Sequence, residues 1–175
     1  MSAIITYLIV LVLLFAAELF YFRIADRFNI IDKPNERSSH NYITIRGGGV
    51  IWWVAALLYL LFNLSETAGW FLAGITLIAG VSFVDDVKGL GQKVRLLFHL
   101  LAMSCAFYLA GVFGNYPWWA IVIGYVVFVG IVNAYNFMDG VNGITGLYSI
   151  AVLGSLQYVN LSYGNFVPPD LIWYP

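Results

Sequence analysis

Long apolar segments alternate with short polar segments along this chain of 175 residues. A helix rises about 1.5 Å per residue, so roughly 17 to 20 apolar residues cross a hydrocarbon core. Backbone groups in lipid need internal hydrogen bonds, which favours helices for such segments. The pattern therefore predicts an all-α, polytopic membrane helical bundle of about six transmembrane helices, forming a single transmembrane domain over residues 1–175. The predicted spans are Ala3–Phe22, Val50–Leu64, Ala68–Val84, Leu96–Val112, Pro117–Val132 and Ile144–Val159.

The composition strengthens the membrane interpretation. Hydrophobic residues make up 62% of the chain and charged residues only 10%, whereas about a quarter of a typical soluble domain is charged. The net charge of −1 says nothing about an acidic or basic partner, so the distribution of charge has to carry that argument. We expect no nucleic acid to bind. The one cysteine, Cys105, excludes an intrachain disulfide and a cysteine metal cluster, so we expect it to pack as a small apolar residue.

The positions of the basic residues predict the orientation. All eight lysines and arginines fall between the first and second predicted spans or between the third and fourth. By the positive-inside rule both segments are cytoplasmic and the N-terminus is outside. The fifth span then delivers the polar stretch Asn133–Gly143 to the same face. We therefore expect three polar, glycine-bearing segments to converge there as a functional site. The basic residues are Arg23, Arg27, Lys33, Arg37, Arg46, Lys88, Lys93 and Arg95.

The first polar segment ends in DKPNERSSHNYITIRGGG, residues 32–49. Arginine presents a planar fork that suits phosphate oxygens, and glycine permits close backbone approach to a ligand. Arg46 is therefore a candidate phosphate ligand, and His40 is a candidate contact for a phosphate or a lipid. The alternative is a solvated loop that only sets the topology.

The second polar segment, FVDDVKGLGQKVRL, follows the third span. Two adjacent carboxylates, Asp85 and Asp86, repel one another and are costly near lipid unless a cation or partner compensates them. Magnesium bound to a diphosphate would compensate them, because it prefers oxygen ligands. Alternatively the two aspartates cap a helix or pair with the nearby bases Lys88, Lys93 and Arg95.

The third polar segment, NAYNFMDGVNG, repeats an oxygen-bearing side chain at a spacing of three. On a continuing helix, residues three apart lie on roughly one face. Such a row can ligate a metal or hydrogen-bond a nucleotide, whereas a plain turn rich in asparagine and glycine is the alternative. The row consists of Asn133, Asn136, Asp139 and Asn142.

These three strings resemble, in the same order, the polyprenyl-phosphate N-acetylhexosamine-1-phosphate transferases of glycosyltransferase family 4. These integral membrane enzymes begin bacterial cell-wall, O-antigen and related glycan synthesis. The chain departs from the family at Ile45, where many relatives have proline. Nothing after Gly143 resembles the family's later motifs, so the likeness is to the N-terminal half of such an enzyme.

The resemblance implies a reaction and a location. A UDP-N-acetylhexosamine would donate its sugar 1-phosphate to undecaprenyl phosphate at the cytoplasmic face of the bacterial inner membrane. By resemblance, Asp85 and Asp86 would be catalytic, with Asp85 deprotonating or positioning the lipid phosphate. Asn136 would bind Mg²⁺, while the remaining polar residues would hold substrate. Asp139 and Asn142 would contact the nucleotide, and Lys93 and Arg95 would hold phosphate. Arg46 and His40 are the other two substrate-binding candidates.

Two further interpretations remain open from the residues. One is a catalytically inactive fragment of such an enzyme. If the chain is active, a homodimer is one arrangement that would supply two half-sites. The other is a small multispanning transporter in which Asp85, Asp86 and Glu18 carry ions. Transporters more often place such charges near the bilayer midplane, which favours the enzyme.

Overall fold

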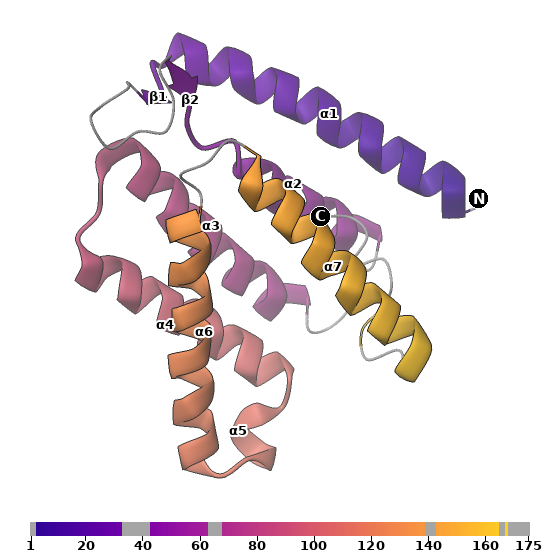
Figure 1. Ribbon diagram of the computed structural model, residues 1–175, viewed down its shortest axis with the longest axis vertical. Helices are drawn as coiled ribbons and strands as arrows, with labels where there is room; N and C mark the ends of the chain where they lie inside the picture. The colour runs from indigo at the N-terminus through magenta and orange to yellow at the C-terminus, as the bar shows by residue number, and fades with distance from the viewer. Residues whose placement is uncertain (1–2, 33–42, 63–67, 139–142, 165–166, 168–175) are drawn as a thin grey trace. The chain divides into compact units, whose positions relative to one another are not determined.

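The computed structural model describes residues 3–32, 43–62, 68–138, 143–164 and 167 (Figure 1). Within them the chain forms seven helices and one antiparallel ladder of two very short strands, which confirms the predicted helical fold class. The elements are α1 (Ala3–Arg27), β1 (Ile31–Asp32), β2 (Thr44–Ile45), α2 (Val50–Phe62), α3 (Ala68–Lys88), α4 (Gln92–Leu109), α5 (Val112–Asn115), α6 (Trp118–Met138) and α7 (Ile144–Tyr163).

Within the part of the chain that the structure describes, four helices are long and apolar enough to cross a membrane, namely α1, α3, α6 and α7. Their apolar side chains are largely exposed, and α6 has no buried residue among those described. A helix that is apolar on all sides but exposed needs lipid or other protein around it. The chain is therefore an integral membrane protein. At 13 residues α2 is shorter than a simple span, and α4 is not among the four, so the total of six stays a prediction.

Several helices extend beyond the apolar segments that predicted them. α1 continues to Arg27, α3 to Lys88 and α6 to Met138. A helix can leave the hydrocarbon layer without ending, and a basic residue in its last turn favours the negative end of the helix dipole. The sequence placed all eight basic residues in two loops, which is wrong for five of them. Arg23 and Arg27 lie in α1, Lys88 lies in α3, and Lys93 and Arg95 lie in α4. A further difference is α5, which occupies a segment expected to be a loop.

The described structure divides into two compact units: unit 1 comprises Met1–Phe62 and Met138–Pro175, and unit 2 comprises Asn63–Phe137. The single domain stays a prediction. In unit 1, α1 packs against α2, and the ladder pairs Ile31 with Ile45. The buried apolar residues of these two helices are Val10, Tyr21, Ala25, Ala55, Ala56 and Leu60.

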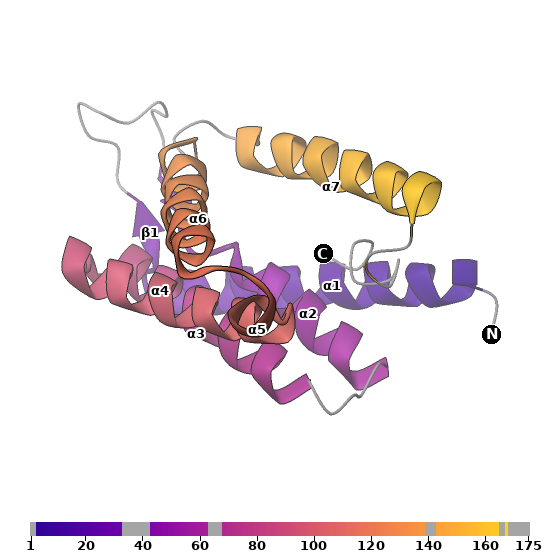
Figure 2. The same cartoon turned by 90° about the horizontal axis from the view of Figure 1, so that it is seen from below.

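Unit 2 is built on α3 and α4, which lie side by side in both views (Figures 1 and 2) and form the most extensive helix contact among the described residues. They approach closely at Gly74, where an added Cβ would lie 3.2 Å from Cβ of Cys105. Cys105 is buried, as the sequence predicts. The hydroxyls of Ser104 and Tyr125 lie 2.7 Å apart and join α4 to α6, which crosses it steeply in both views.

The contact between α4 and α6 depends on a glycine. An added Cβ at Gly124 would lie 2.6 Å from Cζ of Phe107. The Phe107 ring is buried and packs edge-on against the rings of Phe113 and Tyr125, so it has little room to move. Gly124 therefore permits a ring to lie directly on the helix backbone.

We expect Gly124→Ala to destabilise the protein by about 1 to 3 kcal/mol relative to Gly130→Ala, because only the first methyl group overpacks a ring. Gly130 lies on the same helix with nothing within 4 Å of an added Cβ, so alanine there gains only helix propensity, up to about 1 kcal/mol. Equilibrium unfolding of both variants in detergent micelles measures the difference. Equal stability of the two variants would contradict this account of the contact.

Candidate active site

The second polar segment forms a tight corner between α3 and α4. The backbone N–H of Gly89 donates to the carbonyl of Asp85 at 2.8 Å, and Gly89 then adopts φ +67°. Glycine enters this left-handed region without steric cost, so it ends α3 cleanly. Gly91 provides the N-cap of α4 without a side-chain hydrogen bond, and its carbonyl accepts the N–H groups of Val94 and Arg95. The sequence Gly-Leu-Gly is thus the turn itself.

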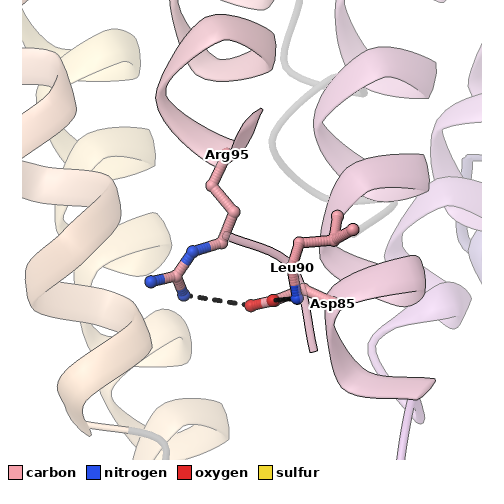
Figure 3. A network of polar contacts seen from close by, with 3 residues as sticks. All are labelled: Asp85, Leu90 and Arg95. Carbon is pink, nitrogen blue, oxygen red and sulfur yellow. Dashed lines mark hydrogen bonds and ion pairs between the residues drawn. The ribbon is translucent and has the colours of Figure 1, made fainter. Parts of the chain in front are cut away.

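The Asp85 side chain closes this corner (Figure 3). Its Oδ1 accepts the backbone N–H of Leu90 at 2.6 Å, and its Oδ2 accepts a hydrogen bond from Nη1 of Arg95 at 3.0 Å. The side chains of Arg95 and Asp85 are 27% and 20% exposed, so solvent screens this ion pair only in part. Asp85 therefore joins the end of α3 to the first turns of α4, and both of its oxygens are already engaged.

Asp86 differs from its neighbour in exposure. Asp85 is half-buried, whereas Asp86 is exposed, as are Lys88 and Lys93. The segment from Asp85 to Arg95 carries three basic residues against two acidic ones. A phosphate group would find an excess of positive charge here, together with one carboxylate that is more accessible than the other.

The described part of the third segment lies on α6. Asn133 and Asn136 are both exposed, one turn apart near the end of that helix. The predicted helical row therefore holds as far as Asn136. Its other members, Asp139 and Asn142, lie outside the described residues, as does His40. Gly143 is the N-cap of α7 and adopts φ +80°.

Arg46 belongs to unit 1, where α1 holds its backbone. The Tyr21 hydroxyl donates to the carbonyl of Arg46, and the N–H of Arg46 donates to the carbonyl of Ile30 at 3.1 Å. An added Cβ at Gly48 would lie 3.3 Å from Oε1 of Glu18, so glycine lets the turn before α2 approach this carboxyl group. The sequence pattern predicted neither the hydrogen bond from Tyr21 to Arg46 nor the close approach of Gly48 to Glu18.

Of the predicted site residues, the structure brings together Asp85 and Arg95. Within the described residues, neither Lys93 nor Asn136 makes a hydrogen bond or ion pair with either of them. The described residues also contain no group of three or more histidine, cysteine, aspartate or glutamate side chains that could hold a metal ion. Convergence of all three segments at one membrane surface stays a prediction.

The model of glycosyl transferase family 4 matches residues 68–169, which include the α3–α4 corner and Asn136. The chain belongs to this family. The match begins after Arg46 and His40, so the family assignment depends on the second and third polar segments rather than the first.

Two curated proteins from bacteria align with most of this chain. One, from Bacillus subtilis (strain 168), is named a probable undecaprenyl-phosphate N-acetylglucosaminyl 1-phosphate transferase; it is 27% identical over 82% of this chain and 44% of its own length. The other, from Yersinia pestis, is named undecaprenyl-phosphate alpha-N-acetylglucosaminyl 1-phosphate transferase; it is 27% identical over 86% of this chain and 46% of its own length. The chain therefore spans about half the length of these relatives. No solved structure matches it.

The Asp85–Arg95 pair can be measured by a double-mutant cycle. We expect Asp85→Asn and Arg95→Gln to show a coupling free energy of about 1 kcal/mol, because the pair is partly screened and connects two packed helices. Equilibrium unfolding of the single and double variants in detergent micelles gives this value. Lys93→Gln is the matched control, since Lys93 is exposed and should change stability by less than about 0.5 kcal/mol. Additive effects of Asp85→Asn and Arg95→Gln on stability would show that the two side chains are not coupled.

Proposed function

We propose that the protein transfers an N-acetylhexosamine 1-phosphate from a UDP-sugar to undecaprenyl phosphate. The observation that carries the proposal is the family match over residues 68–169, which contains the charged corner. The names of both relatives, which include undecaprenyl phosphate and N-acetylglucosaminyl 1-phosphate transfer, support the acceptor and the transferred group. The proposed site is the cytoplasmic face of the bacterial inner membrane, and the product would initiate cell-envelope polysaccharide or O-antigen synthesis.

The proposed step is a phosphoryl transfer. An oxygen of the lipid phosphate forms a bond to the β-phosphorus of the UDP-sugar. The bond from that phosphorus to the bridging oxygen breaks, and UMP leaves with the electron pair. Such reactions depend mainly on positioning and on stabilising the charge that develops on oxygen atoms. The excess of basic residues at the α3–α4 corner suits that requirement.

The chemistry of the acceptor bears on the role of Asp85. The second pKa of a phosphate monoester is about 6, so the lipid phosphate is largely a dianion at pH 7. It then needs little help from a general base. Because both oxygens of Asp85 are already hydrogen-bonded, we assign Asp85 to positioning the corner and not to removing a proton. The exposed Asp86 is the carboxylate better placed to meet a substrate or its metal ion.

Magnesium fits the donor set that this proposal uses. Mg²⁺ is usually held by one or two carboxylates together with substrate phosphates and several waters, so it needs no dense cluster of protein ligands. Asp86 and the amide oxygen of Asn136 are the described residues that would hold it. When bound, it would neutralise charge on the diphosphate. Asp139 and Asn142 would contact the nucleotide, with Arg46 and His40 as additional phosphate ligands.

The proposal predicts that Asp85→Asn and Asn136→Ala each reduce transfer by about 100-fold or more while leaving membrane insertion intact, because preorganised groups of this kind dominate phosphoryl transfer. The assay follows labelled sugar phosphate from UDP-N-acetylglucosamine to undecaprenyl phosphate, with and without Mg²⁺. It uses membranes that contain the protein.

The control is Asn115→Ala, an exposed asparagine in α5 outside the corner, which should retain wild-type turnover. Wild-type turnover in Asp85→Asn or Asn136→Ala would contradict the site assignment. The same assay on residues 1–175 distinguishes a chain that transfers the sugar phosphate, for example as a homodimer, from a catalytically inactive one.

A further inference from the structure

Within unit 1, the C-terminal end of α1 lies against β2 of the two-stranded ladder (Figure 1). The chain reverses where α1 ends: Asn29 adopts φ +54°, and the N–H of Ile30 donates to the carbonyl of Ala25 at 2.8 Å. Asparagine enters the left-handed region more readily than most residues that have a side chain. Because Ala25 is fully buried, the chain that leaves α1 is bonded back to the helix inside the packed part of unit 1.

Arg46 follows β2 directly and is held at both of its backbone polar groups. Its N–H donates to the carbonyl of Ile30 at 3.1 Å, next to the pairing of β1 with β2. Its carbonyl accepts a hydrogen bond from the hydroxyl of Tyr21. Because Ile30 is itself bonded to Ala25, both of these hydrogen bonds connect the Arg46 backbone to α1.

The carbonyl of Arg46 lies where the ladder has ended and α2 has not yet begun. The carbonyls of residues 47–49 accept the first three N–H groups of α2, and Gly47 adopts φ +74°, so the chain changes direction directly after Arg46. The Tyr21 ring is buried and brings its hydroxyl to the Arg46 carbonyl. A backbone acceptor and a buried hydroxyl, each of which needs a partner, thus satisfy one another.

The side chain of Arg46 is exposed, although its backbone is held. A guanidinium group presents a planar fork of N–H donors that can bind phosphate oxygens at two points. Binding of this kind is weaker when the backbone that carries the side chain must first be ordered, because that ordering costs entropy. The Tyr21 hydroxyl bonds the backbone and is uncharged, so it orders Arg46 without neutralising the guanidinium charge that a phosphate requires.

We propose that Tyr21 is a positioning residue that holds Arg46 in place to bind a substrate phosphate. This inference rests on the proposed function, which assigns Arg46 to a phosphate of the substrates. Tyr21 acts through the backbone: its hydroxyl fixes the Arg46 carbonyl, and the exposed guanidinium binds the phosphate. The helix α1 thereby contributes to the site through a side chain that holds another residue.

A double-mutant cycle in the sugar-phosphate transfer assay tests this role, in membranes that contain the protein. Tyr21→Phe removes the hydroxyl and keeps the buried ring, so the protein should fold. We expect this change to lower kcat/KM about fivefold, as the loss of one hydrogen bond would, and by less than about twofold when Arg46→Ala is already present. A merely structural role would give the same loss in both backgrounds, and that result would overturn the proposal. Wild-type kcat/KM in Arg46→Ala would overturn it as well.

Tyr158→Phe is the matched control, because it makes the same chemical change at an exposed tyrosine of α7. It should leave kcat/KM unchanged, both alone and together with Arg46→Ala. An equal loss in Tyr158→Phe and Tyr21→Phe would show that transfer responds to the removal of any tyrosine hydroxyl, which would overturn the role of Tyr21.

Chemical modification of Arg46 tests the same role without requiring turnover. Phenylglyoxal reacts with accessible arginine side chains, and mass spectrometry measures the rate of modification at Arg46 in native membranes. We expect inorganic pyrophosphate to slow this rate in the wild-type protein, and Tyr21→Phe to need about fivefold more pyrophosphate for the same protection. Equal protection of both proteins, or no protection of the wild-type protein, would overturn the inference. Protection that depends on Tyr21, in a protein that transfers no sugar phosphate, would contradict the proposed function alone.

Discussion

The α3–α4 corner depends on one carboxylate that interacts with both helices. Asp85 lies in the last turn of α3, accepts the N–H of Leu90 in the turn and pairs with Arg95 on α4. At the edge of a membrane an ionised side chain is costly unless it is satisfied, and here a backbone amide and an arginine satisfy it. The same contacts fix where α4 begins, and with it the positions of Lys93 and Arg95. The charged surface of the candidate site is thus a consequence of how the two helices are joined.

The sequence predicted the helical class and the places of the long helices well, because an apolar segment of about 20 residues has few stable alternatives in lipid. It did not predict where the helices end. Apolar periodicity stops at Val84 and Val132, whereas α3 and α6 continue to Lys88 and Met138, since a helix needs only hydrogen bonds and not apolar side chains to continue. Asp85 and Asp86 lie in the last turn of α3, at the helix end where the sequence placed them, and Asn136 lies on α6, the continuing helix that its spacing indicated.

The candidate site was predictable in its residue types more than in its contacts. Adjacent aspartates and nearby basic residues were evident, and pairing was one of the alternatives. The particular pair, Asp85 with Arg95, is separated by ten residues and a turn, so no helical spacing indicates it. The link between Tyr21 and the carbonyl of Arg46 is similar, because it joins positions 25 residues apart through the backbone. Contacts of this kind follow from the path of the chain, which a local pattern does not contain.

The α3–α4 pair is held at two separated points. Near one end, Gly74 lets the helices touch at Cys105; at the other, Asp85 binds Arg95. Separating the two helices would break the Asp85–Arg95 ion pair or open the close approach at Gly74. A molecule that lies against Gly80, between these two contacts on α3, therefore meets two helices that are already joined on either side of it. Ordering of these helices then adds less to the entropy lost on binding, which is the advantage of a preorganised site.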